Sequence, residues 1–284
     1  MSLNAILNQL ILPPWWAALI AAAIFAVLAG AFRLLTVSGA IATFVVGFIA
    51  FGLGGGKFTV PLLTFFITAS LLSRVGKALK SSAKVQSKRG ATRDYVQVIA
   101  NGGAASIVVV IFWLVARHWP IDHTRYLLML YLAALATVNA DTWATEIGGL
   151  SRTPPRLLNN WKVAATGASG AVTLLGCLAA LAGSLIVTAA GWLVWRLNGP
   201  EFIAVAWAGF LGSFIDSVLG ASLQAVYQYP ATGELTERTE MNGVKTVKVR
   251  GLGWVNNDVV NFLASIGGIL CAWVLLRYCA YPFK

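Results

Sequence analysis

Charged residues are scarce in this chain of 284 residues. Asp, Glu, Lys and Arg make up 11% of it and hydrophobic residues make up 58%, whereas soluble domains carry about 25% charged residues. Histidine occurs twice and cysteine three times, without a Cys-x-x-Cys spacing. The shortage of charge excludes a soluble domain and indicates an integral membrane protein, and the cysteines need no redox role because they lie in or at the end of apolar runs.

The apolar runs are long enough for membrane-spanning helices of about 20 residues, which favours a helix bundle over a β-barrel. The second and third expected spans are short and are separated by glycines, so a re-entrant pair and seven spans are the alternative. We predict an all-α, polytopic transmembrane helix bundle formed by one membrane domain, residues 1–284. The eight expected spans are approximately residues 15–34, 37–54, 58–74, 94–116, 124–146, 167–195, 202–226 and 255–278.

Basic residues are concentrated in the connections on one side of these expected spans, and the formal net charge is +11. The three basic loops are residues 74–93, 147–166 and 227–254. Cytoplasmic loops of membrane proteins carry an excess of Lys and Arg. We therefore expect these loops on the cytosolic side and both termini on the opposite side, with the positive charge serving orientation and anionic ligands rather than nucleic acid.

Four acidic residues interrupt the apolar sequence near the cytosolic ends of the expected spans. Asp141 and Glu146 end the fifth, Asp216 lies in the inner half of the seventh, and Asp258 opens the eighth. A carboxylate at membrane depth is costly, so its default interpretation is a functional site. We therefore consider the four as candidate catalytic and metal-ligating residues. A helix-packing seam with one hydrogen-bonded Asp is the alternative for Asp216.

Other polar residues accompany these acids. Asn101 shares a helix face with Asp94 and Gln97, and Ser213 lies on the polar face of the seventh expected span. Residues 77–93 hold six basic residues and no acid, so this loop is either a phosphate clamp or an ordinary topology signal. The glycine-rich opening of the sixth span suits phosphate binding or close helix packing equally well.

Carboxylates beside Lys and Arg suit a divalent metal that carries a polyphosphate. Mg²⁺ prefers one or two carboxylates together with phosphate oxygens and water. Phosphoryl transfer requires mainly positioning and charge neutralisation from the protein. The residues alone therefore predict a metal-dependent enzyme acting on a lipid phosphate or alcohol at the cytosolic membrane face.

Five sequence blocks, in order, resemble the motifs of the integral membrane family that contains the phytyl-phosphate kinases, which is similar to phytol kinases and dolichol kinases. The blocks are KRGATRDYVQVIANGG (88–103), NADTWATEIG (139–148), GASGAVTLLG (167–176), GSFIDSVLGASLQ (212–224) and NNDVVNF (256–262). The resemblance implies transfer of the terminal phosphoryl group of a nucleotide, with CTP expected, to phytyl phosphate. The product would be phytyl diphosphate for tocopherol or related prenyl-lipid synthesis.

The resemblance also implies roles for individual residues. The four acids would hold Mg²⁺ and orient the nucleotide, and a homodimer is left open. The residues expected to bind the nucleotide or the phosphates, or to position the acids, are Lys84, Lys88, Arg89, Arg93, Asn101, Asn139, Ser213, Asn257 and Asn261.

Two other functions are the alternatives to this kinase, and the polar residues of the expected spans, which gather at one leaflet, fit the first better than the second. A nucleotidyltransferase that makes a CDP-linked lipid would use similar acids and a similar basic loop. A transporter of prenyl phosphates would require polar groups that continue to the opposite leaflet. The expected partners are the lipid substrate, the nucleotide and the surrounding membrane lipids.

Overall fold

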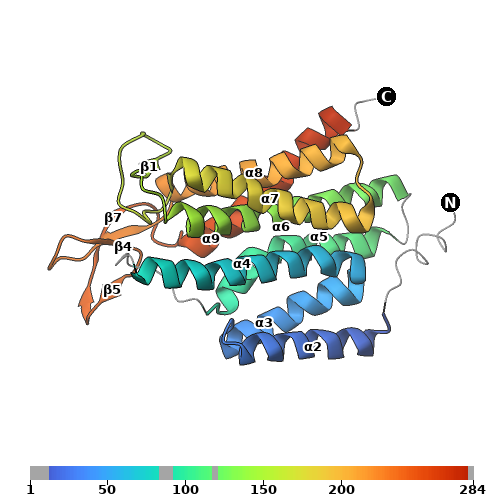
Figure 1. The fold of residues 1–284 in the computed structure, drawn as a ribbon. Helices are drawn as coiled ribbons and strands as arrows, with labels where there is room; N and C mark the ends of the chain where they lie inside the picture. The colour runs from blue at the N-terminus through green and yellow to red at the C-terminus, as the bar shows by residue number, and fades with distance from the viewer. Residues whose placement is uncertain (1–12, 83–91, 117–120, 281–284) are drawn as a thin grey trace.

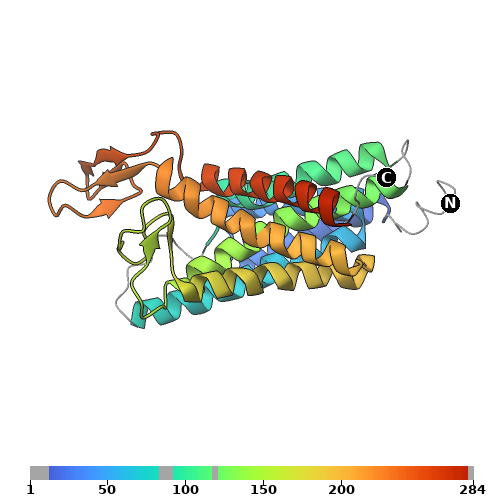
Figure 2. The ribbon, with the colours of Figure 1, turned by 90° about the horizontal axis from the view of Figure 1, so that it is seen from above.

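The computed structural model describes residues 13–82, 92–116 and 121–280. Its described residues form eight helices that run back and forth along one bundle, as Figure 1 and Figure 2 show. This confirms the predicted all-α bundle. The helices are α2 (Trp15–Ala31), α3 (Val37–Phe48), α4 (Gly56–Ser82), α5 (Tyr95–Val115), α6 (Ile121–Gly148), α7 (Leu174–Trp195), α8 (Gly199–Ser222) and α9 (Asn257–Leu275).

Two short π-helices extend this set: η1 (Ile49–Leu53) continues α3, and η2 (Leu276–Ala280) continues α9. Six of the described helices are long and apolar enough to cross a membrane, whereas Trp15–Ala31 and Val37–Leu53 are shorter apolar helices. Helix α4 has 27 residues, or about 40 Å at 1.5 Å per residue. This length does not fit the short re-entrant half that the sequence left as an alternative.

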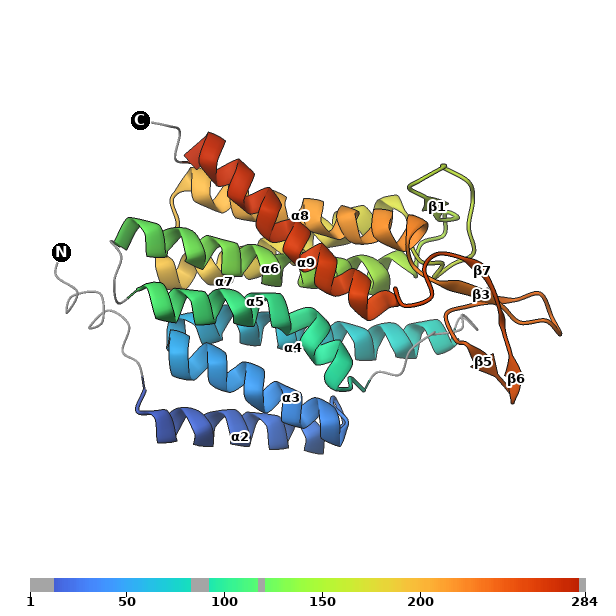
Figure 3. The same cartoon turned by 180° about the vertical axis from the view of Figure 1, so that it is seen from behind.

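Short strands gather at the end of the bundle opposite the start of α2 and the end of α9, as Figure 3 shows. They form antiparallel pairs within the connections that follow α6 and α8. The strands are β1 (Arg156–Leu157), β2 (Ala171–Val172), β3 (Val226–Gln228), β4 (Leu235–Thr236), β5 (Glu240–Met241), β6 (Val244–Lys245) and β7 (Val247–Arg250). We call this the strand end of the bundle and the other the terminus end.

Helix α6 occupies the centre of the bundle, packed against α4, α5, α7, α8 and α9. Its residues Leu132 to Ala136 are almost completely buried. Glycines of its neighbours allow this close approach, because a Cβ atom at Gly209 or Gly212 would collide with Ala136 or Thr137. The most central helix is therefore the one that carries Asp141 and Glu146 toward the strand end.

One expected boundary was wrong. The sequence placed the start of the sixth span at residue 167, but α7 begins at Leu174, with Thr173 as its N-cap. Gly167 and Gly170 have φ angles of +79° and +76°. These left-handed conformations cannot continue a right-handed helix, so residues 167–173 form a connection that contains the short strand β2 instead.

Candidate functional site at the strand end

A cavity with a volume of about 300 Å³ opens at the strand end of the bundle. Asp141 and Glu146 of α6 line it together with Asp216 of α8. The size falls within the range of small-molecule sites. The tertiary structure therefore brings three of the four candidate acids to one cavity, although 50 residues of sequence (149–198) lie between α6 and α8.

The two acids of α6 reach different parts of this cavity. Helix α6 remains regular through Gly148, and five positions on a helix turn a side chain through about 140°. Helix α6 therefore has no break between Asp141 and Glu146 that would bring the two carboxylates to the same side. Glu146 lies against α4, where a Cβ atom added to Gly76 would stand 2.5 Å from its Oε2 atom.

Asp216 lies beside a group of asparagines contributed by α5 and α9. The Asn261 side chain lies 3.2 Å from the amides of both Asn101 and Asn257. With its amide turned toward Asp216, Asn261 donates to Oδ2 at 2.9 Å. Three helices thus contribute polar groups to one network around the carboxylate, and Asp216, Asn101, Asn257 and Asn261 all line the cavity.

Arg93 closes another side of the cavity. Its backbone is fixed by the connection between α2 and α3, because Arg93 N donates to Leu34 O at 2.9 Å and Thr36 N donates to Arg93 O at 3.0 Å. The guanidinium lies over the rings of Phe65 and Phe66, 5.7 Å and 5.9 Å from their centres.

The charge of Arg93 persists in this setting. Burial lowers the pKa of Arg93 to about 10, while the nearby Glu146 carboxylate opposes the shift. The guanidinium therefore remains a cation at neutral pH.

The loop of residues 166–173 forms a further wall of the cavity. Gly170 approaches the backbone of α8 so closely that a Cβ atom would collide with Ser217 O and Ala221 N. Thr173 accepts a hydrogen bond from Gly176 N at 3.0 Å and so caps α7. Close packing is confirmed for Gly170, whereas phosphate binding by this loop stays a prediction.

Of the remaining candidate residues, one lines the cavity and the others lie away from it or outside the described part of the chain. Asp258 is in the first turn of α9 and does not line the cavity. Asn139 is completely buried, donates to Gly183 O at 2.7 Å and accepts from Thr68 at 3.0 Å, so it joins helices away from the cavity. Ser213 lines the cavity and donates to Phe210 O at 2.7 Å. Lys84, Lys88 and Arg89 are outside the described residues.

Within residues 13–82, 92–116 and 121–280, no three His, Cys, Asp or Glu side chains are grouped closely enough to hold a metal by themselves. Mg²⁺ often takes only one or two protein carboxylates and completes its coordination with substrate phosphates and water. The carboxylate, amide and hydroxyl oxygens of this cavity are the donor types that Mg²⁺ prefers. The magnesium site therefore stays a prediction that involves a substrate as well as the protein.

Polar residues outside the predicted set of site residues also line the cavity, among them Gln224 and Glu237. Gln224 is 1% exposed, and among the described residues its Nε2 donor has no hydrogen-bond partner. Glu237, in the loop between β4 and β5, accepts a hydrogen bond from Ser169 at 2.5 Å. Gln224 is the last residue of the block 212–224 that resembles a family motif, whereas Glu237 lies in the basic loop 227–254, which matches no motif.

The helices and the polar cavity define a class, a multi-pass membrane protein with a ligand-sized site at one end of its bundle. The family is also identified: the chain belongs to the DUF92 family of integral membrane proteins, whose pattern matches residues 20–269. The match contains every described residue of the candidate site, and it confirms the predicted integral membrane protein.

Three relatives span most of this chain. Protein PGR of Arabidopsis thaliana is 33% identical over 255 residues, which cover 82% of this chain and 85% of that protein. A membrane protein of Methanocaldococcus jannaschii is 30% identical over 248 residues, 87% of each chain. Protein VTE6, chloroplastic, of A. thaliana is 24% identical over 237 residues, 83% of this chain and 64% of that protein. No solved structure matches this chain.

Proposed function

We propose that this protein is a membrane-embedded phosphotransferase of prenyl-lipid metabolism. It would transfer the terminal phosphoryl group of a nucleotide, with CTP as the expected donor, to phytyl phosphate or a similar isoprenyl monophosphate. The observation that carries the proposal is the cavity at the strand end, where Asp141, Glu146 and Asp216 meet Arg93. The five sequence blocks that resemble the phytyl-phosphate kinase family supply the cavity with most of its polar residues.

The proposed reaction forms one bond and breaks one. An oxygen of the acceptor phosphate attacks the terminal phosphorus of the nucleotide, and the bond from that phosphorus to the bridging oxygen breaks. The nucleoside diphosphate leaves with the bridging oxygen, and the acceptor becomes a diphosphate. The acceptor oxygen is already ionised at neutral pH, so a strong general base is unnecessary. The small number of histidines in the chain, two in all, agrees with a reaction that needs no strong general base.

The residues of the cavity suit the separate tasks of this reaction. Arg93 is a planar cation that can grip phosphate oxygens through two hydrogen bonds. The unpartnered donor of Gln224 is costly to bury, so a ligand oxygen beside it would stabilise the complex. Asn101 and Asn261 would hold the Asp216 carboxylate in position.

Asp141, Glu146 and Asp216 are the residues that would hold Mg²⁺ with the nucleotide. The bound ion would neutralise phosphate charge during transfer. Asp258 is retained as a fourth proposed ligand on the resemblance alone, because it lies outside the cavity lining. We also propose that the strand end faces the cytosol, since the described parts of the basic loops lie there.

The test is a transfer assay with purified protein, Mg²⁺ and each nucleoside triphosphate in turn. Phytol, phytyl phosphate, geranylgeranyl phosphate and farnesyl phosphate serve as acceptors. The expected result is an isoprenyl diphosphate together with a nucleoside diphosphate. Release of inorganic pyrophosphate with a nucleotide-linked lipid would establish nucleotidyl transfer instead. Nucleotide-independent movement of labelled prenyl phosphate across vesicles, without a new product, would establish a transporter.

A further inference from the structure

A second cavity lies between α2, α3, α4 and α5, and its volume is also about 300 Å³. Its walls are mostly apolar, which sets it apart from the cavity that holds the acids. Small-molecule sites are usually apolar concavities of this kind with a few placed polar groups. The apolar side chains that define its walls include Phe25, Val46, Phe51, Leu62, Leu63 and Phe66.

The two cavities share part of their lining. Arg93 and Asn101 line both of them. Arg93 contacts the apolar side through Phe65 and Phe66, and on the other side it lies near the Glu146 carboxylate. A permanent cation therefore stands where an apolar space meets a polar one. That is the arrangement expected for a ligand with a hydrocarbon tail and an anionic head.

The packing of the helices explains why the space exists. Helix α3 packs against α2 and α5, whereas α4 packs chiefly against α6 and α7. The helices α2, α3 and α5 meet helix α4 at η1, toward the terminus end. Toward the strand end they meet in a small apolar cluster, where Phe25 and Phe66 make an edge-to-face contact at 5.1 Å. Small residues of α2 and α3, among them Ala21, Ala22 and Gly47, leave room between these two closures.

We propose that this apolar cavity binds the isoprenoid tail of the acceptor, with the acceptor phosphate held at Arg93. The assignment rests on the proposed function and adds the place and direction of the lipid substrate. The tail lies between α2, α3, α4 and α5, and the head projects toward the acids. The outward faces of α2 and α3 are strongly apolar, with Ile24 and Ile41 exposed, so the substrate reaches the cavity from the hydrocarbon core of the membrane.

The first test fills the cavity with a larger side chain. Val46 lines the cavity, and its neighbour Val45 does not and is 47% exposed on the outside of α3. Val46→Phe is expected to raise the KM for a C20 isoprenyl phosphate by roughly tenfold, the effect of excluding about two methylene groups from an apolar site. The KM for a C10 isoprenyl phosphate should change much less, and Val45→Phe should behave as the parent protein does.

Helix α2 offers a second matched pair. Ala21 lines the cavity, whereas Ile20 is exposed on the same helix. Ala21→Trp should reproduce the selective loss of the C20 substrate, and Ile20→Trp should not. Equal kinetics for each cavity variant and its control, in protein that elutes as a single folded species, would overturn the tail assignment.

A binding measurement separates this inference from the proposed reaction. A photoreactive C20 isoprenyl phosphate is cross-linked to the full chain in nanodiscs without nucleotide, and the labelled peptides are identified. Labels within residues 21–25, 43–51 and 59–66 support the assignment even if no phosphoryl transfer is found. Active protein labelled only elsewhere would overturn the assignment and leave the function standing. Equal labelling by a photoreactive phosphatidylglycerol that the isoprenyl phosphate does not displace would identify a structural lipid and also overturn it.

Discussion

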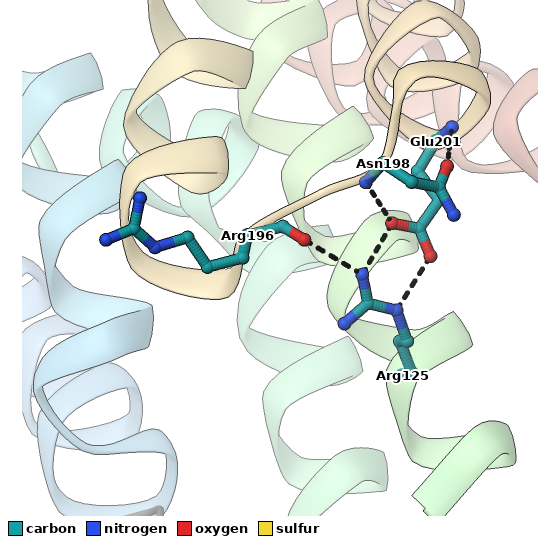
Figure 4. Close-up of polar contacts among 4 residues, drawn as sticks. All are labelled: Arg125, Arg196, Asn198 and Glu201. Atoms are coloured by element: carbon teal, nitrogen blue, oxygen red, sulfur yellow. Dashed lines mark hydrogen bonds and ion pairs between the residues drawn. The ribbon is translucent and has the colours of Figure 1, made fainter.

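At the terminus end of the bundle, Glu201 is bound by Arg125, whereas at the strand end Asp141, Glu146 and Asp216 line a cavity. Figure 4 shows the closed arrangement at the terminus end. Arg125 donates to both carboxylate oxygens of Glu201, at 2.7 Å and 2.6 Å. Carboxylates at the two ends of the bundle therefore have different roles, depending on whether protein groups or a cavity surround them.

The local structure around Glu201 accounts for its burial. Asn198 N donates to the Glu201 carboxylate at 2.8 Å, and Glu201 N donates to Asn198 Oδ1 at 2.9 Å, which forms a capping box at the start of α8. Arg125 also donates to Arg196 O at 3.3 Å, joining α6 to the connection between α7 and α8. A carboxylate satisfied in this way stabilises the helix ends.

The comparison teaches that an acid within a membrane bundle is not sufficient to identify a site. The polar groups of the strand end come from five helices (α4, α5, α6, α8 and α9) and from three connections between helices, and they surround a space large enough for a ligand. The polar groups at Glu201 bond one another. We therefore expect substitutions at the strand end to change activity and substitutions at the terminus end to change stability.

Replacement of Asp216 should have the largest effect. Asp216→Ala is expected to reduce turnover by about 10³-fold, because a preorganised charge is removed from the reacting phosphates. The thermal unfolding temperature in detergent should stay close to that of the parent protein. Glu240→Ala, an exposed acid of the strand loops, is the control and should retain full turnover. Parent-like turnover of Asp216→Ala would remove α8 from the proposed site.

Replacement of Glu201 should show the opposite pattern. Glu201→Gln leaves the Arg125 guanidinium, whose side chain is 33% exposed, beside a neutral partner. The loss of unfolding free energy should therefore lie below the value of about 3–5 kcal/mol that is typical of breaking a fully buried ion pair. The measurement is thermal unfolding of Glu201→Gln, Arg125→Gln and the double variant as a double-mutant cycle. Activity per folded molecule should be preserved. Loss of activity without loss of stability would contradict the distinction between the two ends.

Arg93→Lys is expected to have an intermediate effect. The charge remains, but the planar group that lies over Phe65 and Phe66 and can bind a phosphate through two hydrogen bonds is lost. The KM for the isoprenyl phosphate should rise by roughly tenfold, the equivalent of one strong hydrogen bond, with a smaller change for the nucleotide. An increase confined to the nucleotide would place Arg93 on the donor side of the site.

The smallest effect is expected from Gly76→Ala in α4. The new methyl group would meet the Glu146 carboxylate and displace it within the cavity. We expect a decrease in kcat of about threefold to tenfold, because small displacements of positioning groups lower catalytic rates. Gly56→Ala is the matched control, since a Cβ atom there meets nothing within 4 Å. Equal rates for the two variants would show that the position of Glu146 is unimportant.

The sequence by itself determined the membrane class and the approximate positions of the eight helices. Long apolar runs must be helical in lipid because backbone polar groups have no other partners there. The same logic identified Asp141, Glu146 and Asp216, since carboxylates are costly in apolar segments. The same reasoning also selected Asp258 and Asn139, which are polar residues in apolar segments but do not line the cavity.

Only the tertiary structure decided which polar residues meet. Asp258 and Asn257 are neighbours in sequence, yet the first turn of α9 brings only Asn257 to the cavity. Arg125 and Glu201 are 76 positions apart, and their pairing depends on how α6 and α8 pack. A sequence pattern shows which polar groups lie in apolar segments and are therefore costly to bury. Helix packing determines whether such a group bonds another protein group or faces an open cavity.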